Sequence, residues 1–103
     1  MRYAPKQWRA VAILMRDSSY AILEALTETP KTWTELKLSA KLTDGGLQKV
    51  LRELIKMNIV EETLVDSEGF KKKKYALKRT ARKEKIYEKA KDLKASLEKL
   101  ALT

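Results

Sequence analysis

Six basic residues lie between positions 71 and 79, with no acidic residue among them. They are Lys71, Lys72, Lys73, Lys74, Lys78 and Arg79. A local block of positive charge attracts a polyanion, because each cation placed near a phosphate can release a condensed counterion. Residues 1–70 have a net charge of zero, so residues 71–103 carry the whole net charge of +9. The alternative is a solvated face that only keeps the chain soluble.

A second group of useful side chains lies in a predicted helix that begins after Thr43. The candidate contact residues of this helix are Thr43, Asp44, Gly45, Gln48, Lys49 and Arg52. A glutamine amide can pair with adenine, and lysine or arginine can reach guanine or phosphate. Asp44 would repel phosphate, unless it only caps the helix or accepts a hydrogen bond from a cytosine amine.

Two glycines, Gly45 and Gly46, lie at the start of this predicted helix. Each costs about 1 kcal/mol of helix propensity relative to alanine, so each requires a reason. One reason is a close approach of the backbone to a binding partner. The alternative is a flexible loop before a helix that begins only at Leu47.

The residue types that are missing limit the chemistry. The 103 residues include no cysteine and no histidine, which excludes disulfides, thiolate or imidazole metal sites and a histidine general base. We find no phosphate loop, nucleophile elbow or paired acid–base group, so we expect no catalysis, no cofactor and no metal.

Apolar runs, the N-terminal residues and the amino-acid usage indicate where the protein is located in the cell and what kind of organism it comes from. The longest apolar run, from Ala10 to Met15, is too short to span a bilayer. The N-terminus lacks the apolar region and cleavage site of a signal peptide, so we expect a cytoplasmic protein with no membrane partner. Lysine and glutamate are abundant while asparagine and glutamine are rare, which is typical of proteins from hot environments and favours a thermophilic, archaeal source.

Helical spacing of apolar residues predicts four helices before residue 58. They cover roughly residues 5–15, 18–29, 33–38 and 43–57. Pro5 is placed to start the first, and Asp17 or Ser18 to cap the second. Thr32 and Glu35 predict a capping box at the third.

The segment after Asn58 predicts a β-hairpin. Residues 59–65 are rich in β-branched side chains, residues 66–69 form a turn, and residues 70–77 form the basic return strand. One long charged helix is expected from about Thr80. The expected fold is mainly α with a small β-hairpin. It divides into a domain over residues 1–79 and a C-terminal dimerisation helix over residues 80–103.

The last predicted helix has one narrow apolar stripe. Its members, spaced four, three, four and three residues apart, are Ile86, Ala90, Leu93, Leu97 and Leu100. The intervening residues are mostly charged, so the stripe needs a partner. Trp8, Val11 and Met15 could pack against it within the same interface. We favour a homodimer over terminal helices that fold back on their own domain, because the domain is small.

The order of these elements describes a winged helix-turn-helix, and residues 19–80 resemble winged-helix transcription factors of the ArsR, MarR and PadR type. The matching segments are Ala21–Leu26, Trp33–Leu36, Val50–Leu54, Asn58–Val60 and Tyr75–Leu77. Members of these families commonly have Tyr-x-Leu-Thr followed shortly by glycine. This chain has Lys78 and Ala81 at those positions, so Thr80 is the expected cap of the last helix.

The resemblance implies a homodimer that binds a palindromic operator in double-stranded DNA and regulates transcription. The helix after Thr43 would enter the major groove by its N-terminal end. The wing residues would be Phe70, Lys71, Lys72, Lys73 and Lys74. The lysines would bind phosphate without sequence choice, and Phe70 would either wedge into a minor groove or pack at the base of the wing.

Because the net charge lies after residue 70, we expect the wing to supply most of the affinity and the helix to add a limited sequence preference. Two alternatives remain. One is a winged-helix module that binds another protein. The other is a non-specific, chromatin-like protein that binds nucleic acid by charge alone.

Overall fold

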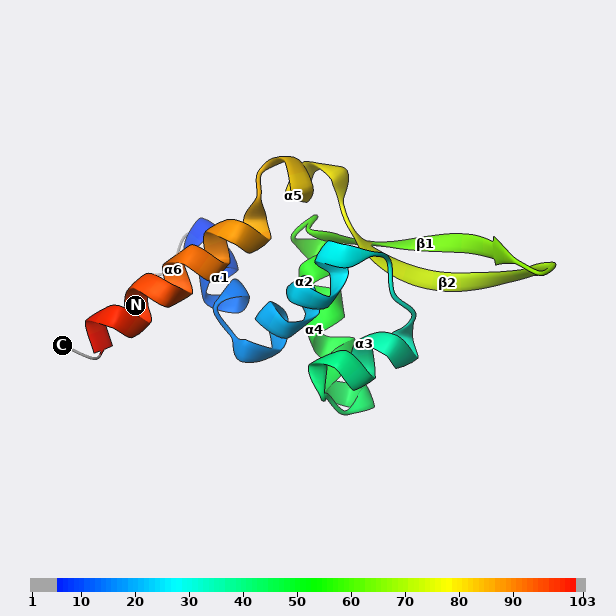
Figure 1. Cartoon of the computed structure of the whole chain (residues 1–103), viewed down its shortest axis with the longest axis horizontal. Coiled ribbons are helices and arrows are strands. Elements are labelled where there is room, and N and C mark those ends of the chain that lie inside the picture. The colour runs from blue at the N-terminus through cyan, green and yellow to red at the C-terminus, as the bar shows by residue number, and fades with distance from the viewer. Residues whose placement is uncertain (1–5, 102–103) are drawn as a thin grey trace.

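The computed structural model describes the chain from residue 6 to residue 101, so Pro5 lies outside the described residues. The elements in order are α1 (Lys6–Leu14), α2 (Asp17–Glu28), α3 (Trp33–Ala40), α4 (Asp44–Lys56), β1 (Val60–Ser67), β2 (Phe70–Leu77), α5 (Arg79–Lys83) and α6 (Ile86–Ala101). The predicted class, mainly helical with one two-stranded hairpin, is confirmed (Figure 1).

The predicted cap is confirmed for α3 but not for α2. Thr32 caps α3 through the expected capping box, in which its side chain accepts from the Glu35 amide and the Glu35 carboxylate accepts from the Thr32 amide. Those bonds lower the pKa of Glu35. The predicted cap of α2 is wrong, because Arg16 holds the N-cap position without a side-chain bond and Asp17 lies in the first turn. There its negative charge complements the helix dipole.

The hairpin runs further and turns more tightly than predicted. Its strands pair antiparallel from Val60 opposite Leu77 to Ser67 opposite Phe70, so β1 extends two residues beyond its expected end. Only Glu68 and Gly69 form the turn, and both have positive φ angles, 49° and 82°. Two such residues define a turn whose twist matches that of the flanking strands, which lets the strands continue to the tip.

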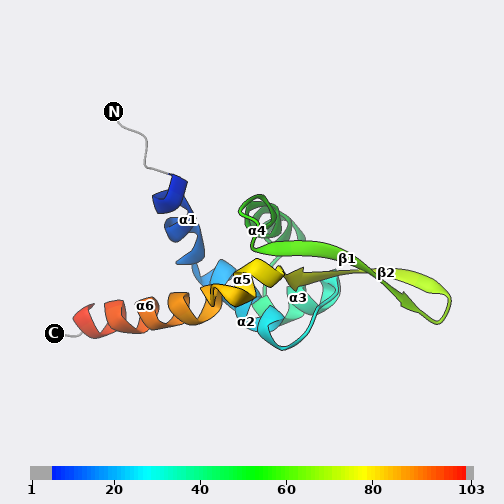
Figure 2. The same cartoon turned by 90° about the horizontal axis from the view of Figure 1, so that it is seen from above.

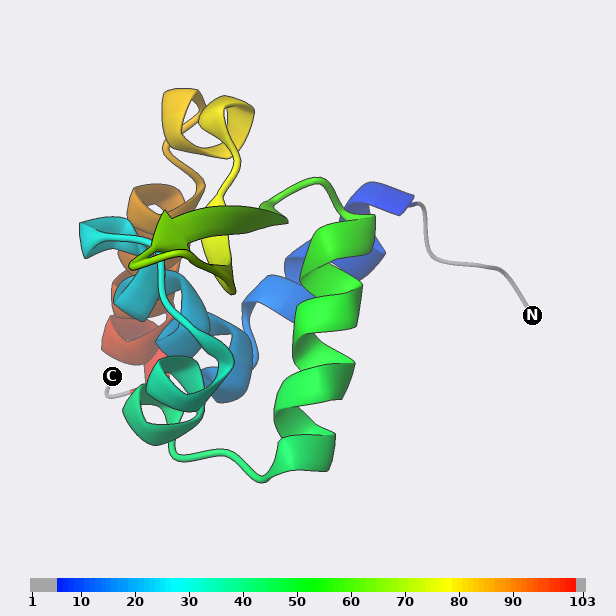
Figure 3. The ribbon, with the colours of Figure 1, turned by 90° about the vertical axis from the view of Figure 1, so that its right-hand side faces the viewer.

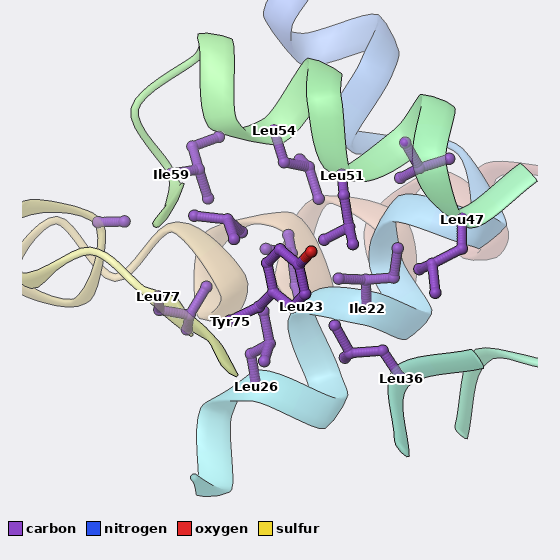
Figure 4. Close-up of a cluster of buried hydrophobic side chains, with 13 residues drawn as sticks. Ile22, Leu23, Leu26, Leu36, Leu47, Leu51, Leu54, Ile59, Tyr75 and Leu77 are labelled. Carbon is purple, nitrogen blue, oxygen red and sulfur yellow. The ribbon is translucent and has the colours of Figure 1, made fainter. Parts of the chain in front are cut away.

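One core holds the helices and the base of the hairpin together (Figure 4). Its fully buried members come from α2, α3, α4 and β1, and they are Ile22, Leu23, Leu26, Leu36, Leu47, Leu54 and Val60. From β2, the ring of Tyr75 enters the same cluster with 6% of its surface exposed. The backbone of Lys31 pairs with Tyr75 through two hydrogen bonds of 2.7 and 2.9 Å, which attaches the base of the hairpin to the segment before α3.

The C-terminal segment is not the single helix that was expected from Thr80. It forms α5 and α6, separated at Glu84 and Lys85, and Lys85 has a φ of 54°. A residue in the left-handed region interrupts a right-handed helix, and α6 therefore starts in a new direction (Figure 2). The expected cap at Thr80 is also wrong, since Lys78 holds the N-cap position and Thr80 lies inside α5.

The molecule is elongated, with principal extents of 54 × 31 × 29 Å. The hairpin projects from one end of the helical core, and the C-terminal part of α6 projects from the opposite end (Figures 1 and 2). This arrangement leaves α4 on the side of the core next to the hairpin (Figure 3).

Candidate nucleic-acid interface

Helix α4 divides cleanly into a buried face and a polar face. Leu47, Val50, Leu51 and Leu54 are buried in the core. On the opposite side a shallow groove is lined by four exposed side chains, Gln48, Lys49, Arg52 and Lys56, together with Gly45 and Glu53. Figure 3 shows this helix standing beside the hairpin at the surface of the molecule. Three of the predicted contact residues, Gln48, Lys49 and Arg52, therefore share one accessible surface.

The N-terminal end of α4 is ordered by Thr43, as predicted. Its hydroxyl oxygen accepts a hydrogen bond of 3.1 Å from the Gly46 amide. Both glycines belong to the helix, which begins at Asp44, so the alternative of a loop up to Leu47 is wrong. A side chain at Gly46 would place its Cβ 3.1 Å from the Thr43 hydroxyl oxygen, whereas a Cβ at Gly45 would meet nothing within 4 Å. The absence of a side chain at Gly46 therefore leaves room for the cap. No contact within the chain explains the absence of a side chain at Gly45.

Asp44 is held by two residues of α3 that the sequence analysis did not connect with it. Trp33 Nε1 donates to Asp44 Oδ1 over 3.0 Å, and Lys37 Nζ lies 3.1 Å from the same oxygen. The hydrogen bond from Trp33, followed by the contact with Lys37, lowers the pKa of Asp44. Its negative charge is thus partly offset by Lys37.

A cleft of about 330 Å³ separates α4 from the hairpin. Its walls are formed by Trp33, Gln48, Leu51, Arg52, Ile55, Glu62, Lys73 and Tyr75. The ring of Trp33 lies 6.4 Å from that of Tyr75, centroid to centroid, and the two form part of this lining. The cleft joins the polar face of α4 to one face of the hairpin, so a single extended ligand could contact both.

The four lysines of β2 lie on both faces of the hairpin. Lys71 and Lys73 stand opposite Asp66 and Leu64, while Lys72 and Lys74 stand opposite Val65 and Thr63. Lys71, Lys72 and Lys73 are exposed, and Lys74 is half-buried.

Lys73 has a partner within the hairpin. Its Nζ lies 3.2 Å from Glu62 Oε1, and this contact raises the pKa of Lys73. Among the described residues, no ion pair involves Lys71, Lys72 or Lys74.

The hairpin as a whole is electrically neutral, which was not recognised from the block of lysines alone. Residues 60–77 contain four lysines and four acidic residues. The acidic residues are Glu61, Glu62, Asp66 and Glu68, on β1 and in the turn. Strand pairing places them next to the lysines, so their fields partly cancel at a distance. The expectation that the wing provides most of the electrostatic attraction therefore loses its basis.

Apolar side chains accompany the lysines toward the tip of the hairpin. Leu64 is 66% exposed and Phe70 is 72% exposed. Phe70 lies next to the turn, opposite Ser67, so it does not pack at the base of the hairpin. Of the two placements considered for Phe70, only the exposed one agrees with the structure.

The residues predicted for a dimer interface lie at the other end of the molecule, on α1 and α6. Val11 and Met15 line an apolar cavity of about 140 Å³ together with Leu14, Ile86, Lys89, Ala90 and Leu93. Ala90 is 7% exposed, so the first part of the predicted stripe already packs within the chain. Further along, Leu93, Leu97 and Leu100 are 42%, 49% and 69% exposed. Trp8 on α1 is 65% exposed.

A polar cluster that sequence analysis missed joins α6 to α2. Tyr87 Oη donates to Glu24 Oε2 over 3.0 Å and lies 3.4 Å from Tyr20 Oη. Two turns further along α6, Lys94 Nζ lies 4.4 Å from the centre of the Tyr20 ring and 3.4 Å from Asp17 Oδ1. These contacts fix the direction in which α6 leaves the core. The only sequence signal for them is the spacing of four positions from Tyr20 to Glu24, which places both on one helical face.

The Arg16 guanidinium forms an ion pair of 3.0 Å with Glu53 on α4. This pair connects the segment between α1 and α2 to the C-terminal half of α4. Residues 37 positions apart gave no local signal for it.

The described residues contain no candidate metal-binding group and no candidate membrane-spanning helix. Residues 6–101 include no group of three acidic, cysteine or histidine side chains that could hold a metal ion. None of their helices is long and apolar enough to cross a membrane.

Comparisons with known proteins identify the fold. No family model and no curated protein matches the chain. Among solved structures, the diamide-treated YodB from Bacillus subtilis superposes with a TM-score of 0.71, 20% sequence identity, and coverage of 89% of this chain and 92% of that one. A PadR family transcription regulator from Clostridium difficile gives 0.71, 16% identity, and coverage of 82% and 94%.

A third structure, the putative helix-turn-helix transcriptional regulator ytcD, gives a TM-score of 0.68 at 23% identity, with coverage of 90% of this chain and 96% of that chain. The chain therefore has the winged-helix fold of PadR-like transcriptional regulators, and the resemblance drawn from its sequence is confirmed at the level of fold. In this fold α3 and α4 form the helix-turn-helix and β1 and β2 form the wing.

Proposed function

We propose that this protein is a regulator of transcription that binds double-stranded DNA as a homodimer. The observation that carries the proposal is the accessible polar face of α4, which lies across a cleft from the projecting hairpin. The resemblance in fold to transcriptional regulators supports it. In this proposal α4 enters the major groove and the hairpin follows the phosphate backbone.

Each part of the surface has its own role. Gln48, Lys49 and Arg52 are exposed along α4 and can reach base edges or phosphates. Lys71, Lys72 and Lys74 contact phosphate from the hairpin, and Lys73 does so once it leaves Glu62. Because the hairpin is neutral overall, we expect α4 to contribute as much to affinity as the wing does.

The homodimer rests on the apolar surface of α1 and α6. Leu93 and Leu97 remain about half exposed on a helix whose other faces are charged, and Trp8 is exposed on α1. A second copy would cover these side chains and set the distance between the two α4 helices. That distance must match the spacing of two half-sites on one face of the duplex.

The test is affinity for duplex DNA as a function of salt. We expect the logarithm of the association constant to fall linearly with the logarithm of the salt concentration, because counterions are released. Replacing Lys71, Lys72, Lys73 and Lys74 by alanine should weaken binding to all sequences alike. Replacing Gln48 or Lys49 should change the sequence preference instead.

If the protein binds no duplex at low salt, the proposed function as a DNA-binding regulator is wrong. A duplex pool that yields no preferred sequence, together with equal affinity for another polyanion such as heparin, would favour the non-specific alternative.

A protein-binding module is the second candidate, and one observation favours it. Val65 and Phe70 expose apolar surface on one face of a hairpin without net charge, and exposed apolar patches often mark protein interfaces. In that case Phe70→Ala would leave duplex affinity unchanged. If Phe70 contacts DNA, the same variant weakens binding, and a change of Glu68→Ala at the same tip serves as the control.

A further inference from the structure

The position of Asp44 needs an explanation if α4 enters a DNA groove. Its carboxylate is 68% exposed in the first turn, the end of α4 that would approach the polyanion most closely. It is not needed as the N-cap, because Thr43 already fills that role. A negative charge placed there repels phosphate, so its presence costs affinity unless it makes a contact of its own.

Two contacts hold the Asp44 carboxylate in place. Trp33 Nε1 and Lys37 Nζ both contact Oδ1, at 3.0 and 3.1 Å. Among the described residues, the hydrogen bonds to this carboxylate include none to Oδ2. One oxygen therefore anchors the group while the other remains available as an acceptor. A side chain fixed in this way loses little conformational entropy when it binds.

Space for a partner is present at the next residue of the helix. Gly45 follows Asp44 directly, and a Cβ at Gly45 would meet nothing within 4 Å. The glycine weakens the helix by about 1 kcal/mol relative to alanine, and packing within the chain does not explain that cost. Room for the edge of a base pair does explain it.

We infer that Asp44 is a specificity-determining residue that accepts a hydrogen bond from the exocyclic amine of a cytosine in the major groove. This inference rests on the proposed DNA-binding function. Cytosine presents an amine there without a neighbouring acceptor on the same base, whereas adenine places N7 beside its amine. Guanine and thymine present acceptors that a carboxylate would repel. Asp44 thus selects by repulsion as well as by attraction.

The experiment selects bound duplexes from a random pool with the wild-type protein and with Asp44→Asn. The asparagine keeps an acceptor for Trp33, but it also carries a donor. We expect cytosine to be favoured by about tenfold at one position of each half-site in the wild type. In Asp44→Asn that preference should disappear while the other positions keep theirs. Circular dichroism verifies that the variant folds.

Two further variants separate base recognition from simple charge. Asp66→Asn removes one negative charge from the hairpin, and we expect it to raise affinity for all sequences without altering any preference. Trp33→Phe keeps the aromatic ring but removes the donor that anchors Asp44, so the cytosine preference should weaken at the same position.

The outcomes are distinguishable. If Asp44→Asn raises affinity uniformly, as Asp66→Asn does, and leaves every base preference intact, the inference is wrong while the DNA-binding function stands. If the wild-type protein binds no duplex at low salt, the proposed function fails and the inference fails with it.

Discussion

The Arg82 guanidinium donates a hydrogen bond of 3.1 Å to the main-chain carbonyl of Leu26. A second bond of 3.4 Å reaches the carbonyl of Thr27 in the same turn. The last main-chain carbonyls of a helix have no hydrogen-bond donor within that helix. Here Arg82 of α5, 56 residues further along the chain, supplies the donor to the end of α2. The positive charge also complements the negative end of the helix dipole.

We predict that Arg82→Met lowers the free energy of unfolding by about 1–2 kcal/mol, because it leaves these carbonyls without their donor. In a domain of this size, each kcal/mol corresponds to roughly 4–8 °C in Tm. Thermal denaturation measures the change. Arg79→Met is the matched control, since Arg79 is exposed on the same helix. Equal Tm values for the two variants would contradict a capping role for Arg82.

Ser19 is fully buried, and its hydroxyl has no hydrogen-bond partner in the described structure. A buried hydroxyl without a partner is unfavourable, and alanine is also the better helix former. Ser19→Ala should therefore raise the free energy of unfolding by about 1 kcal/mol in denaturant titrations. Ser18→Ala, half-buried in the same turn, measures the helix propensity alone. A loss of stability in Ser19→Ala, relative to Ser18→Ala, would mean that the hydroxyl does have a partner.

The link between Tyr87 and α2 predicts a dependence of stability on pH. The hydrogen bond with Tyr20, partial burial and the hydrogen bond to Glu24 raise the pKa of Tyr87 above its ordinary value. The unfolded chain then loses this proton before the folded chain does. The stabilisation is complete below about pH 10, the usual tyrosine pKa, and is lost as the pH rises through the higher folded pKa.

We expect wild type to be more stable than Tyr87→Phe at neutral pH by about 0.5–1.5 kcal/mol, the usual net contribution of a hydrogen bond. The difference should shrink above about pH 10. Both proteins contain the same lysines, so the ionisation of the lysines cancels in the difference between the two free energies of unfolding. Urea titrations over this pH range provide the values. A difference that stays constant would show that Tyr87 ionises alike in both states.

The proposed homodimer predicts a change of mass in solution. Leu93→Asp combined with Leu97→Asp should convert a dimer to a monomer in sedimentation, because charged groups would be buried without partners. Leu64→Asp is the control, since Leu64 is equally apolar and 66% exposed, but on the hairpin. A double variant that keeps the dimeric mass would place the interface elsewhere, and a monomeric wild type would contradict the dimer itself.

Much of the architecture followed from local patterns. Apolar spacing located four helices, and side chains able to cap placed the starts of α3 and α4 correctly at Thr32 and Thr43. These features depend on residues within one or two turns, so the sequence shows them directly. The neutrality of the hairpin was also available, by counting both strands instead of the lysines alone.

The contacts between distant residues were not predictable in this way. The break at Lys85 occurs inside a segment rich in helix formers, so its propensity favoured one continuous helix. Ala81 is buried in the core and holds α5 there. The hydrogen bond from Tyr87 to Glu24 holds α6 against α2. These contacts outweigh the local preference for a straight helix.

The sequence by itself therefore determined the class of fold and the polar face of α4, because hydrophobic periodicity and capping are local. Only the tertiary structure decided how the charges are paired. Asp44 is anchored by Trp33 and Lys37, Lys73 is held by Glu62, and Arg16 is held by Glu53. Such pairs form between elements that packing brings together. Packing decides which charged side chains of the wing and of α4 are left accessible for a ligand.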